Sequence, residues 1–179
     1  MSGPKVYLAG PDVFLPDPLA QGALLKVLCR RYGFDGQFPL DGAIVPHPGE
    51  SKPSHGDRIR TANLDLLRDC ALVLANVSPF RGPSADDGTA YEMGYAAALG
   101  KPVFAYSSDR RGLVERTRAM LPCVPGKDNF GNDGLVDASG MFVEDFALPV
   151  NLMLVTSDTG GVHESAEAAL IAARAYFQR

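Results

Sequence analysis

The order of apolar and polar residues along the chain predicts several short, buried strands. Residues 6–9, 71–77 and 103–106 are continuous apolar runs that end at glycine, proline or polar residues, which is typical of strands covered on both faces. The run at residues 71–77 is the clearest of the three. Weaker patterns predict further short strands at residues 34–40 and 141–143.

Apolar residues also recur at three- and four-residue spacing, which predicts helices between the strands. In the first, residues 19–32, Leu24, Leu25 and Leu28 recur at this spacing before Gly33 ends the helix. Further helices are predicted at residues 59–69, 89–99, 113–120 and 165–177, and residues 148–155 are expected to begin another.

Strands and helices therefore alternate four times, and no two strands are joined by a hairpin signal. This alternation is typical of an α/β protein. We expect one domain over residues 1–179, with a single doubly wound, mostly parallel sheet of the flavodoxin or Rossmann-like kind and helices on both faces. Such sheets bind ligands at the carboxyl ends of their strands, so the loops after Ala9, Leu40 and Val77 are the places to search. The polar segment 107–140 has no assigned role.

Composition narrows the classes of partner. The chain is 46% hydrophobic and 21% charged, as ordinary soluble proteins are, and no apolar run approaches the length of a membrane span. A net charge of −4 gives no basic stripe for nucleic acid. Three unpaired cysteines and a short, mixed N-terminus favour a cytoplasmic protein.

Several common catalytic motifs are missing from the sequence. Neither G-x-G-x-x-G after the first strand nor a P-loop occurs, so dinucleotide binding and P-loop phosphate transfer lose their usual support. The three histidines, His47, His55 and His163, share no ligand spacing. We therefore expect neither a metal nor an organic cofactor. Catalysis by Asp and Glu side chains is the remaining candidate chemistry.

Two carboxylates follow the clearest strand. Asp86 lies in the loop after Val77, and Glu92 is expected in the first turn of the next helix, where the helix dipole would keep it ionised. Acidic residues at helix starts are also ordinary caps, and this alternative stays open. Gly88 and Gly94 would let a ligand approach the backbone. Two carboxyl groups in different environments are the usual means of cleaving a glycosidic bond with retention.

The run D-x-G-T-A-Y-E-M-G-Y-A at residues 86–96 resembles the signature of the nucleoside 2-deoxyribosyltransferase family. Segments 6–14, 38–41 and 149–153 are similar to family segments in the same chain order, so the resemblance covers roughly residues 5–155.

The resemblance implies a role for each matched residue. Glu92 would be the nucleophile, Asp86 would transfer a proton to the leaving base, and Tyr7 would steady Glu92. Residues implied to bind substrate are Gly10, Asp12, Phe14, Asn63, Gly88, Asn151 and Met153.

Each matched residue also has a structural alternative. Tyr7 can be plain core, Asn63 a surface amide in mid-helix, and Asn151 an N-cap after Pro149. Many family members carry an aspartate where this chain has Asn63, which pairs with a base but donates no acidic proton. Gly42 and Ala43 stand where some members place a polar side chain that recognises the base.

The resemblance implies an enzyme that passes 2-deoxyribose between nucleobases through a covalent deoxyribosyl-glutamate, in nucleoside salvage. Its partners would be nucleosides, free nucleobases and copies of itself, as a dimer or trimer of dimers with shared active sites. One alternative is a nucleoside or nucleotide N-glycosidase of the same superfamily, although the loop with Asp12 and Phe14 disfavours a phosphate. The other is a non-catalytic nucleoside-binding module. Preference for purine or pyrimidine and tolerance of ribose stay open.

Overall fold

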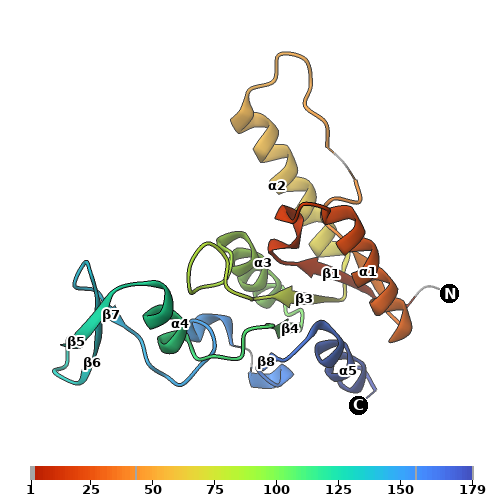
Figure 1. The fold of residues 1–179 in the computed structure, drawn as a ribbon. Coiled ribbons are helices and arrows are strands. Elements are labelled where there is room, and N and C mark those ends of the chain that lie inside the picture. The colour runs from red at the N-terminus through yellow and green to blue at the C-terminus, as the bar shows by residue number, and fades with distance from the viewer. Residues whose placement is uncertain (1–2, 43, 156, 179) are drawn as a thin grey trace.

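A five-stranded parallel sheet forms the centre of the protein. The computed structural model describes residues 3–42, 44–155 and 157–178. The strands are β1 (Lys5–Ala9), β2 (Asp35–Gln37), β3 (Leu72–Asn76), β4 (Val103–Tyr106) and β8 (Val162–His163), in the order β2-β1-β3-β4-β8 (Figure 1). Every neighbouring pair in this sheet is parallel. The predicted doubly wound α/β fold is confirmed.

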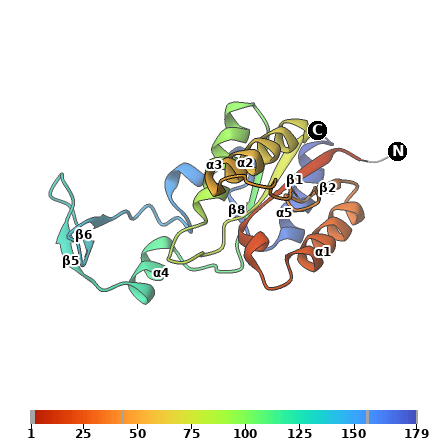
Figure 2. The same ribbon diagram turned by 90° about the horizontal axis from the view of Figure 1, so that it is seen from above.

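Alternate side chains of the strands form two separate cores. Val6 and Leu8 of β1 face α1 (Pro18–Arg31) and α5 (Ala166–Tyr176). Tyr7 and Ala9 face the opposite side, with α2 (Lys52–Asp69) and α3 (Asp87–Ala98). Successive side chains of a strand point to opposite faces of the sheet, so one short apolar run supplies residues to both cores. Figure 2 shows the two helical layers on either side of the sheet.

Helix α2 begins seven residues before the predicted start at residue 59. Ser51 caps its N-terminus, because the Ser51 side chain accepts a hydrogen bond from the Ser54 backbone amide, and Pro53 suits the first turn. Its buried residues, Leu64 and Leu67, lie near its C-terminal end, while the first half extends away from the sheet (Figure 1). The missing apolar face explains why the sequence pattern shortened this helix.

The expectation that no hairpin occurs is wrong. After α4 (Leu113–Met120), the strands β5 (Cys123–Lys127), β6 (Asp133–Asp137) and β7 (Phe142–Val143) form a separate antiparallel sheet. The first turn is built by Asp128, whose Oδ1 accepts hydrogen bonds from the amides of Phe130 and Asn132. This small sheet, which we call the arm (residues 121–146), lies away from the central sheet in both views (Figures 1 and 2).

The remaining connections are short 3-10 turns. These are η1 (Pro11–Phe14), η2 (Leu152–Leu154) and η3 (Ser157–Thr159). The helix expected to begin within residues 148–155 is therefore only the single turn η2. None of the helices in the described ranges is long and apolar enough to cross a membrane.

Candidate functional site

The central feature of the site is a hydrogen bond between a buried tyrosine and a glutamate. Tyr7 lies in β1 with no exposed surface, and its hydroxyl donates to Oε1 of Glu92 at 2.5 Å. Strand pairing places Tyr7 beside Val73 of β3, and Met93 of α3 packs into the same core. The carboxylate is thus held over the two central strands, at the strand-order switch point where doubly wound sheets bind ligands.

Glu92 lies in the second turn of α3, so the expectation that it lies in the first turn is wrong. The helix dipole acts mainly within the first turn and therefore does not hold Glu92 ionised. Burial raises the pKa of Glu92 to about 7, the Tyr7 hydrogen bond lowers it, and the charge of Asp86 raises it. Burial and the neighbouring Glu92 also raise the pKa of Tyr7, so its hydroxyl stays a donor. Near neutral pH the carboxyl group of Glu92 exchanges between both protonation states.

Asp86 is the N-cap of α3. Its Oδ2 accepts from the Thr89 amide at 2.8 Å and from the Thr89 hydroxyl at 3.0 Å. Gly88 belongs to this turn, where an added Cβ would lie 3.1 Å from Oδ2 of Asp86. Because the charge of Asp86 acts on Glu92, the cap and the buried carboxyl group belong to one electrostatic unit.

The loop after β1 is organised by Asp12, which is buried in η1. Its two carboxylate oxygens accept from Gln21 Nε2 at 2.9 Å and from Asn76 Nδ2 at 2.8 Å. Gly10 has φ of 156°, and a Cβ there would lie 2.7 Å from both Asn76 Cβ and Asp12 Oδ2. Asp12 therefore joins the ends of β1 and β3, and glycine is required beside it. Sequence reasoning missed Gln21 and Asn76, because neither belongs to a recognisable motif.

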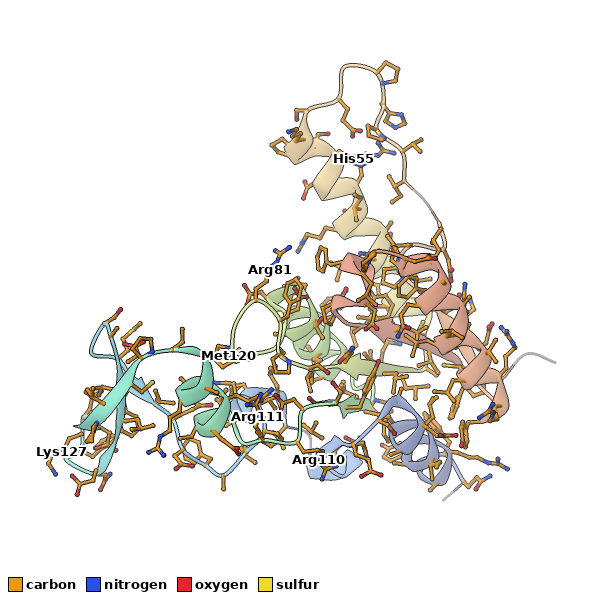
Figure 3. The ribbon with its side chains drawn as sticks, viewed as in Figure 1. His55, Arg81, Arg110, Arg111, Met120 and Lys127 are labelled. Carbon is orange, nitrogen blue, oxygen red and sulfur yellow. The ribbon has the colours of Figure 1, made fainter. Side chains whose placement is uncertain are left out.

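Phe14 is exposed and stacks on Phe80 from the loop after β3, with ring centroids 5.1 Å apart. The Arg81 guanidinium lies over both rings, 5.3 Å from Phe14 and 4.6 Å from Phe80. Figure 3 shows Arg81 on the loop between β3 and α3. The stack ties this loop to the loop after β1, a contact that the sequence pattern gives no means of predicting.

Asn63 lies on α2 and lines a mainly apolar cavity of about 350 Å³. Leu40 and Asp41, from the segment after β2, also line it. Asp41 accepts from the Phe38 amide at 3.0 Å and pairs with Lys26, which fixes the segment. Leu66 lines this cavity and also packs against the core cluster that contains Tyr7. Residue 43 lies outside the described residues.

The segment that contains Asn151 and Met153 packs beside α3 of its own chain. Val150 is buried in the core that includes Met93, and η2 lies against α3. Asn151 is the N-cap of η2, and its Oδ1 accepts from the Met153 amide at 3.0 Å. The side chain of Met153 is 80% exposed. The structure thus places these residues near the site without a direct contact to Glu92 among the described hydrogen bonds.

Comparison with known proteins identifies the family. The model for nucleoside 2-deoxyribosyltransferase matches residues 6–153. The chain belongs to the nucleoside 2-deoxyribosyltransferase family. A solved structure of the 2-deoxyribosyltransferase from Leishmania mexicana superimposes with a TM-score of 0.71 and 35% identity, covering 97% of this chain and 96% of that chain. An uncharacterized protein of Schizosaccharomyces pombe is 34% identical over 159 residues, covering 84% of this chain and 74% of that protein.

Membership of the nucleoside 2-deoxyribosyltransferase family confirms the resemblance seen in the sequence and supports a transferase. The family model matches the chain from β1 to η2. The superposition on the Leishmania mexicana structure covers 97% of this chain and therefore extends over the arm as well.

Proposed function

We propose that this protein transfers 2-deoxyribose from one nucleobase to another, with Glu92 as the nucleophile. The observation that supports this most strongly is the hydrogen bond from the Tyr7 hydroxyl to Glu92 Oε1. It fixes one oxygen of a mostly buried carboxyl group at the carboxyl ends of β1 and β3, where the second oxygen remains available for attack.

The proposed reaction has two displacement steps. Oε2 of Glu92 attacks C1′ of a 2′-deoxynucleoside, the C1′–N bond breaks, and its electron pair leaves with the base, which takes up a proton. A deoxyribosyl ester of Glu92 forms. A second base then attacks C1′, loses its proton and releases the carboxylate, so that the configuration is retained.

The electrostatics suit this cycle. A positively charged, oxocarbenium-like sugar favours the anionic form of a carboxyl group whose pKa lies at about 7 in the free site. Tyr7 donates to the same oxygen before and after the ester forms and holds it in place. Because the buried Tyr7 hydroxyl already holds this oxygen of Glu92, little reorganisation of the site is needed when the reaction occurs.

Asp86 is proposed to deliver the proton to the leaving base, directly or through water. Its Oδ2 is engaged by Thr89, which leaves Oδ1 for this transfer. The cap thus fixes one oxygen of the carboxyl group and orients the other. Asp86 would start the first step in its acid form and give its proton to the base, and the proton that the acceptor base loses in the second step would return to it.

The cavity lined by Asn63 is proposed to hold the nucleobase. Its apolar residues, Leu40, Ile59 and Leu66, offer flat contact to a ring, and its volume of about 350 Å³ falls within the usual size of ligand pockets. The Asn63 amide presents a donor and an acceptor to a base edge. Phe14 and Gly10, in the loop after β1, are proposed to contact the sugar and base from the other side.

Base exchange tests the proposal. Deoxyuridine with adenine, and deoxyinosine with cytosine, should each give the exchanged nucleoside by chromatography. Deoxynucleoside alone should be hydrolysed slowly, and consumption should accelerate when a second base is added. If water serves as well as adenine, the protein is an N-glycosidase. If nucleosides bind without any turnover, it is a binding module.

A further inference from the structure

Asn76, at the end of β3, is hydrogen-bonded on both sides, and the proposed reaction does not use it. Its Nδ2 donates to Oδ2 of Asp12 at 2.8 Å, and its Oδ1 accepts from the Ser78 backbone amide at 3.1 Å. The two ends of this side-chain amide are not interchangeable, because a flipped amide would face a donor with a donor and an acceptor with an acceptor. Asn76 thus joins the loop after β1 to the loop after β3 in one defined orientation.

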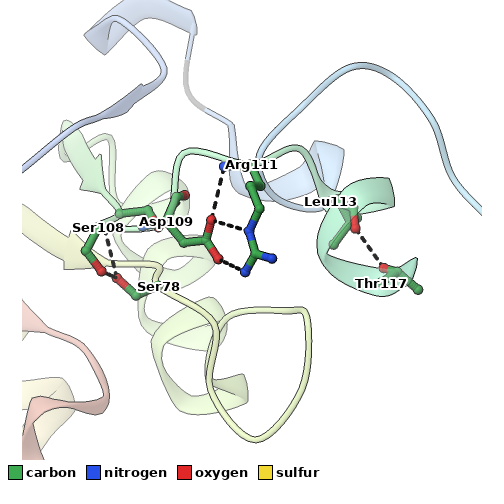
Figure 4. A network of polar contacts seen from close by, with 7 residues as sticks. Ser78, Ser108, Asp109, Arg111, Leu113 and Thr117 are labelled. Carbon is green, nitrogen blue, oxygen red and sulfur yellow. Dashed lines mark hydrogen bonds and ion pairs between the residues drawn. The ribbon is translucent and has the colours of Figure 1, made fainter. Parts of the chain in front are cut away.

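These bonds belong to a longer polar chain, which consists of Gln21, Asp12, Asn76, Ser78 and Ser108. Oδ1 of Asp12 accepts from Gln21 on α1 at 2.9 Å, and Oγ of Ser78 accepts from the Ser108 amide at 3.2 Å. Figure 4 shows the end of this chain at Ser78 and Ser108. Because β1, β3 and β4 are neighbours in the sheet, the polar chain links the loops at three adjacent strand ends.

The burial of Asp12 depends on Asn76. Asp12 is only 6% exposed and takes part in none of the ion pairs among the described residues, so two neutral amides stabilise its carboxylate. A buried carboxylate that loses one of its donors is destabilised. Gly10 packs against the same asparagine, since a Cβ at Gly10 would lie 2.7 Å from Cβ of Asn76. Asn76 therefore holds both the turn at Gly10 and the carboxylate of Asp12.

The two loops that Asn76 joins lead to the groups around Glu92. The loop after β1 holds Gly10 and Phe14, and it follows the strand that bears Tyr7, the donor to Glu92. The loop after β3 runs to Asp86, the N-cap of the helix that carries Glu92. A shift of one loop against the other would therefore change the space between the proposed sugar contacts and the proposed proton donor.

We propose that Asn76 is a positioning residue, which fixes the loop with Gly10 and Phe14 in the place where it receives the deoxyribose of the substrate. Asp12 acts through the same loop without touching the sugar, because it is buried and both of its carboxylate oxygens are engaged. The inference rests on the proposed function, which assigns the sugar contact to this loop. It adds a residue from outside the segments that resemble the family, and its effect is on substrate affinity more than on the chemical step.

A substitution and its repair test the role of Asn76. Asn76→Asp keeps the size of the side chain and the acceptor for Ser78, but it turns a second carboxylate toward Asp12. At about pH 8, which favours ionised carboxylates, KM for deoxyinosine in base exchange with cytosine should rise at least about tenfold, with a smaller change in kcat. Adding Asp12→Asn exchanges donor and acceptor, because the new amide at position 12 donates to the carboxylate at position 76 and still accepts from Gln21. The double variant should recover most of the lost affinity.

Two further measurements separate positioning from folding. Asn129→Asp makes the same change at an exposed position of the arm and should leave KM unchanged. A variant that merely unfolds in part would lower the apparent kcat without changing KM. Dissociation constants for deoxyinosine, measured by titration calorimetry in the Glu92→Ala background to prevent turnover, should follow the same order as the KM values.

Each failure has its own pattern. Affinities that follow this order without base exchange in the wild type would contradict the proposed function and keep the role of Asn76. Base exchange with unchanged KM and affinity in Asn76→Asp would overturn the role of Asn76 and keep the transfer. A double variant no better than Asn76→Asp would also overturn it, because Asp12 would then act on the substrate through its own charge. A wild-type protein that neither exchanges bases nor binds deoxyinosine would contradict both.

Discussion

At the scale of single residues, the contact between Tyr7 and Glu92 determines the chemistry of the site. Two opposing effects act on one carboxyl group: burial favours its neutral form and the phenol favours its anion. Burial is the larger effect, so the pKa lies at about 7, well above that of a free glutamate. We therefore expect the ionisation of Glu92 to change near neutral pH, and substitutions of Glu92 and Tyr7 test this separately.

Replacement of Glu92 should remove transfer and keep binding. Glu92→Ala is expected to lower kcat by at least about 10³-fold with little change in nucleoside affinity, because the carboxylate acts mainly in the transition state. Wild-type protein trapped with a 2-fluoro-2-deoxy nucleoside should carry a sugar adduct on the peptide that contains Glu92, by denaturing mass spectrometry. Glu115→Ala, an exposed glutamate on α4, is the control and should behave as wild type. An adduct on another peptide would contradict the assignment.

The pH profile should follow the ionisation of Glu92. Only the anion attacks, so kcat/KM is expected to rise with pH through about 7 and then level off. Tyr7→Phe removes the hydrogen bond that lowers this pKa, so its rise should move to higher pH. If Tyr7→Phe lowers kcat/KM equally at every pH and the rise stays at the same pH, Tyr7 contributes only by packing in the core. Circular dichroism should show that the variant keeps its fold.

At the scale of secondary-structure elements, the predictable parts are those whose sequence pattern is local. β1, β3 and β4 are continuous apolar runs buried on both faces, and their positions follow directly from sequence. The pattern at residues 141–143 predicts the last strand of the arm, β7, but not β5 and β6, because Pro125, Gly126 and Gly134 interrupt them and carry no strand preference. β8 has two residues, Val162 and His163, and forms only by pairing with β4. Nothing local marks so short a strand.

The site shows the same division. Glu92, Asp86 and Tyr7 are predicted as site residues because their segments resemble a family signature, whereas the pKa of Glu92 depends on packing between β1 and α3. The partners of Asp12 come from α1 and the end of β3, far apart in sequence. Such long-range contacts leave no periodic pattern, so the environment of these residues cannot be predicted from sequence.

The first turn of α3 allows the two roles of Asp86 to be separated. Asparagine caps helices about as well as aspartate but supplies no acidic proton. Asp86→Asn should therefore have the melting temperature of wild type but a lower kcat. The decrease in kcat should be largest with donor nucleosides whose base is a poor leaving group. Asp86→Ala should lose kcat and also about 1 kcal/mol of unfolding free energy. If Asp86→Asn keeps full kcat with every donor, Asp86 serves only as a cap.

At the scale of the whole molecule, exposed apolar side chains lie on η2, beside the helix that carries Glu92. The segment with Asn151 presents Leu152 and Met153 to the surface. The arm adds further exposed apolar side chains, with Phe130 90% exposed. Water that reached Glu92 would compete with the acceptor base for the sugar ester. A second copy of the chain placed against η2 would exclude it.

We therefore predict that the active site is shared between subunits, with Asn151 serving a neighbour's pocket. Glu92→Ala and Asn151→Ala should each be nearly inactive. After the two are unfolded and refolded together in equal amounts, hybrid dimers should hold one site that lacks both residues and one intact site. Random pairing makes about half of all dimers hybrid, so roughly a quarter of wild-type activity should return. Activity is measured by base exchange, with the oligomeric state checked by light scattering.

A matched mixture provides the control. Tyr7 and Glu92 contact each other within one chain, so Glu92→Ala mixed with Tyr7→Phe leaves a defect in every site of every hybrid. That mixture should regain nothing beyond the activity of Tyr7→Phe itself. If activity returns only in the mixture of Glu92→Ala with Asn151→Ala, the Asn151 and Glu92 of one active site come from different chains. Absence of recovery from a refolded, oligomeric mixture would instead place Asn151 in its own chain's site, where its Oδ1 already holds the Met153 amide.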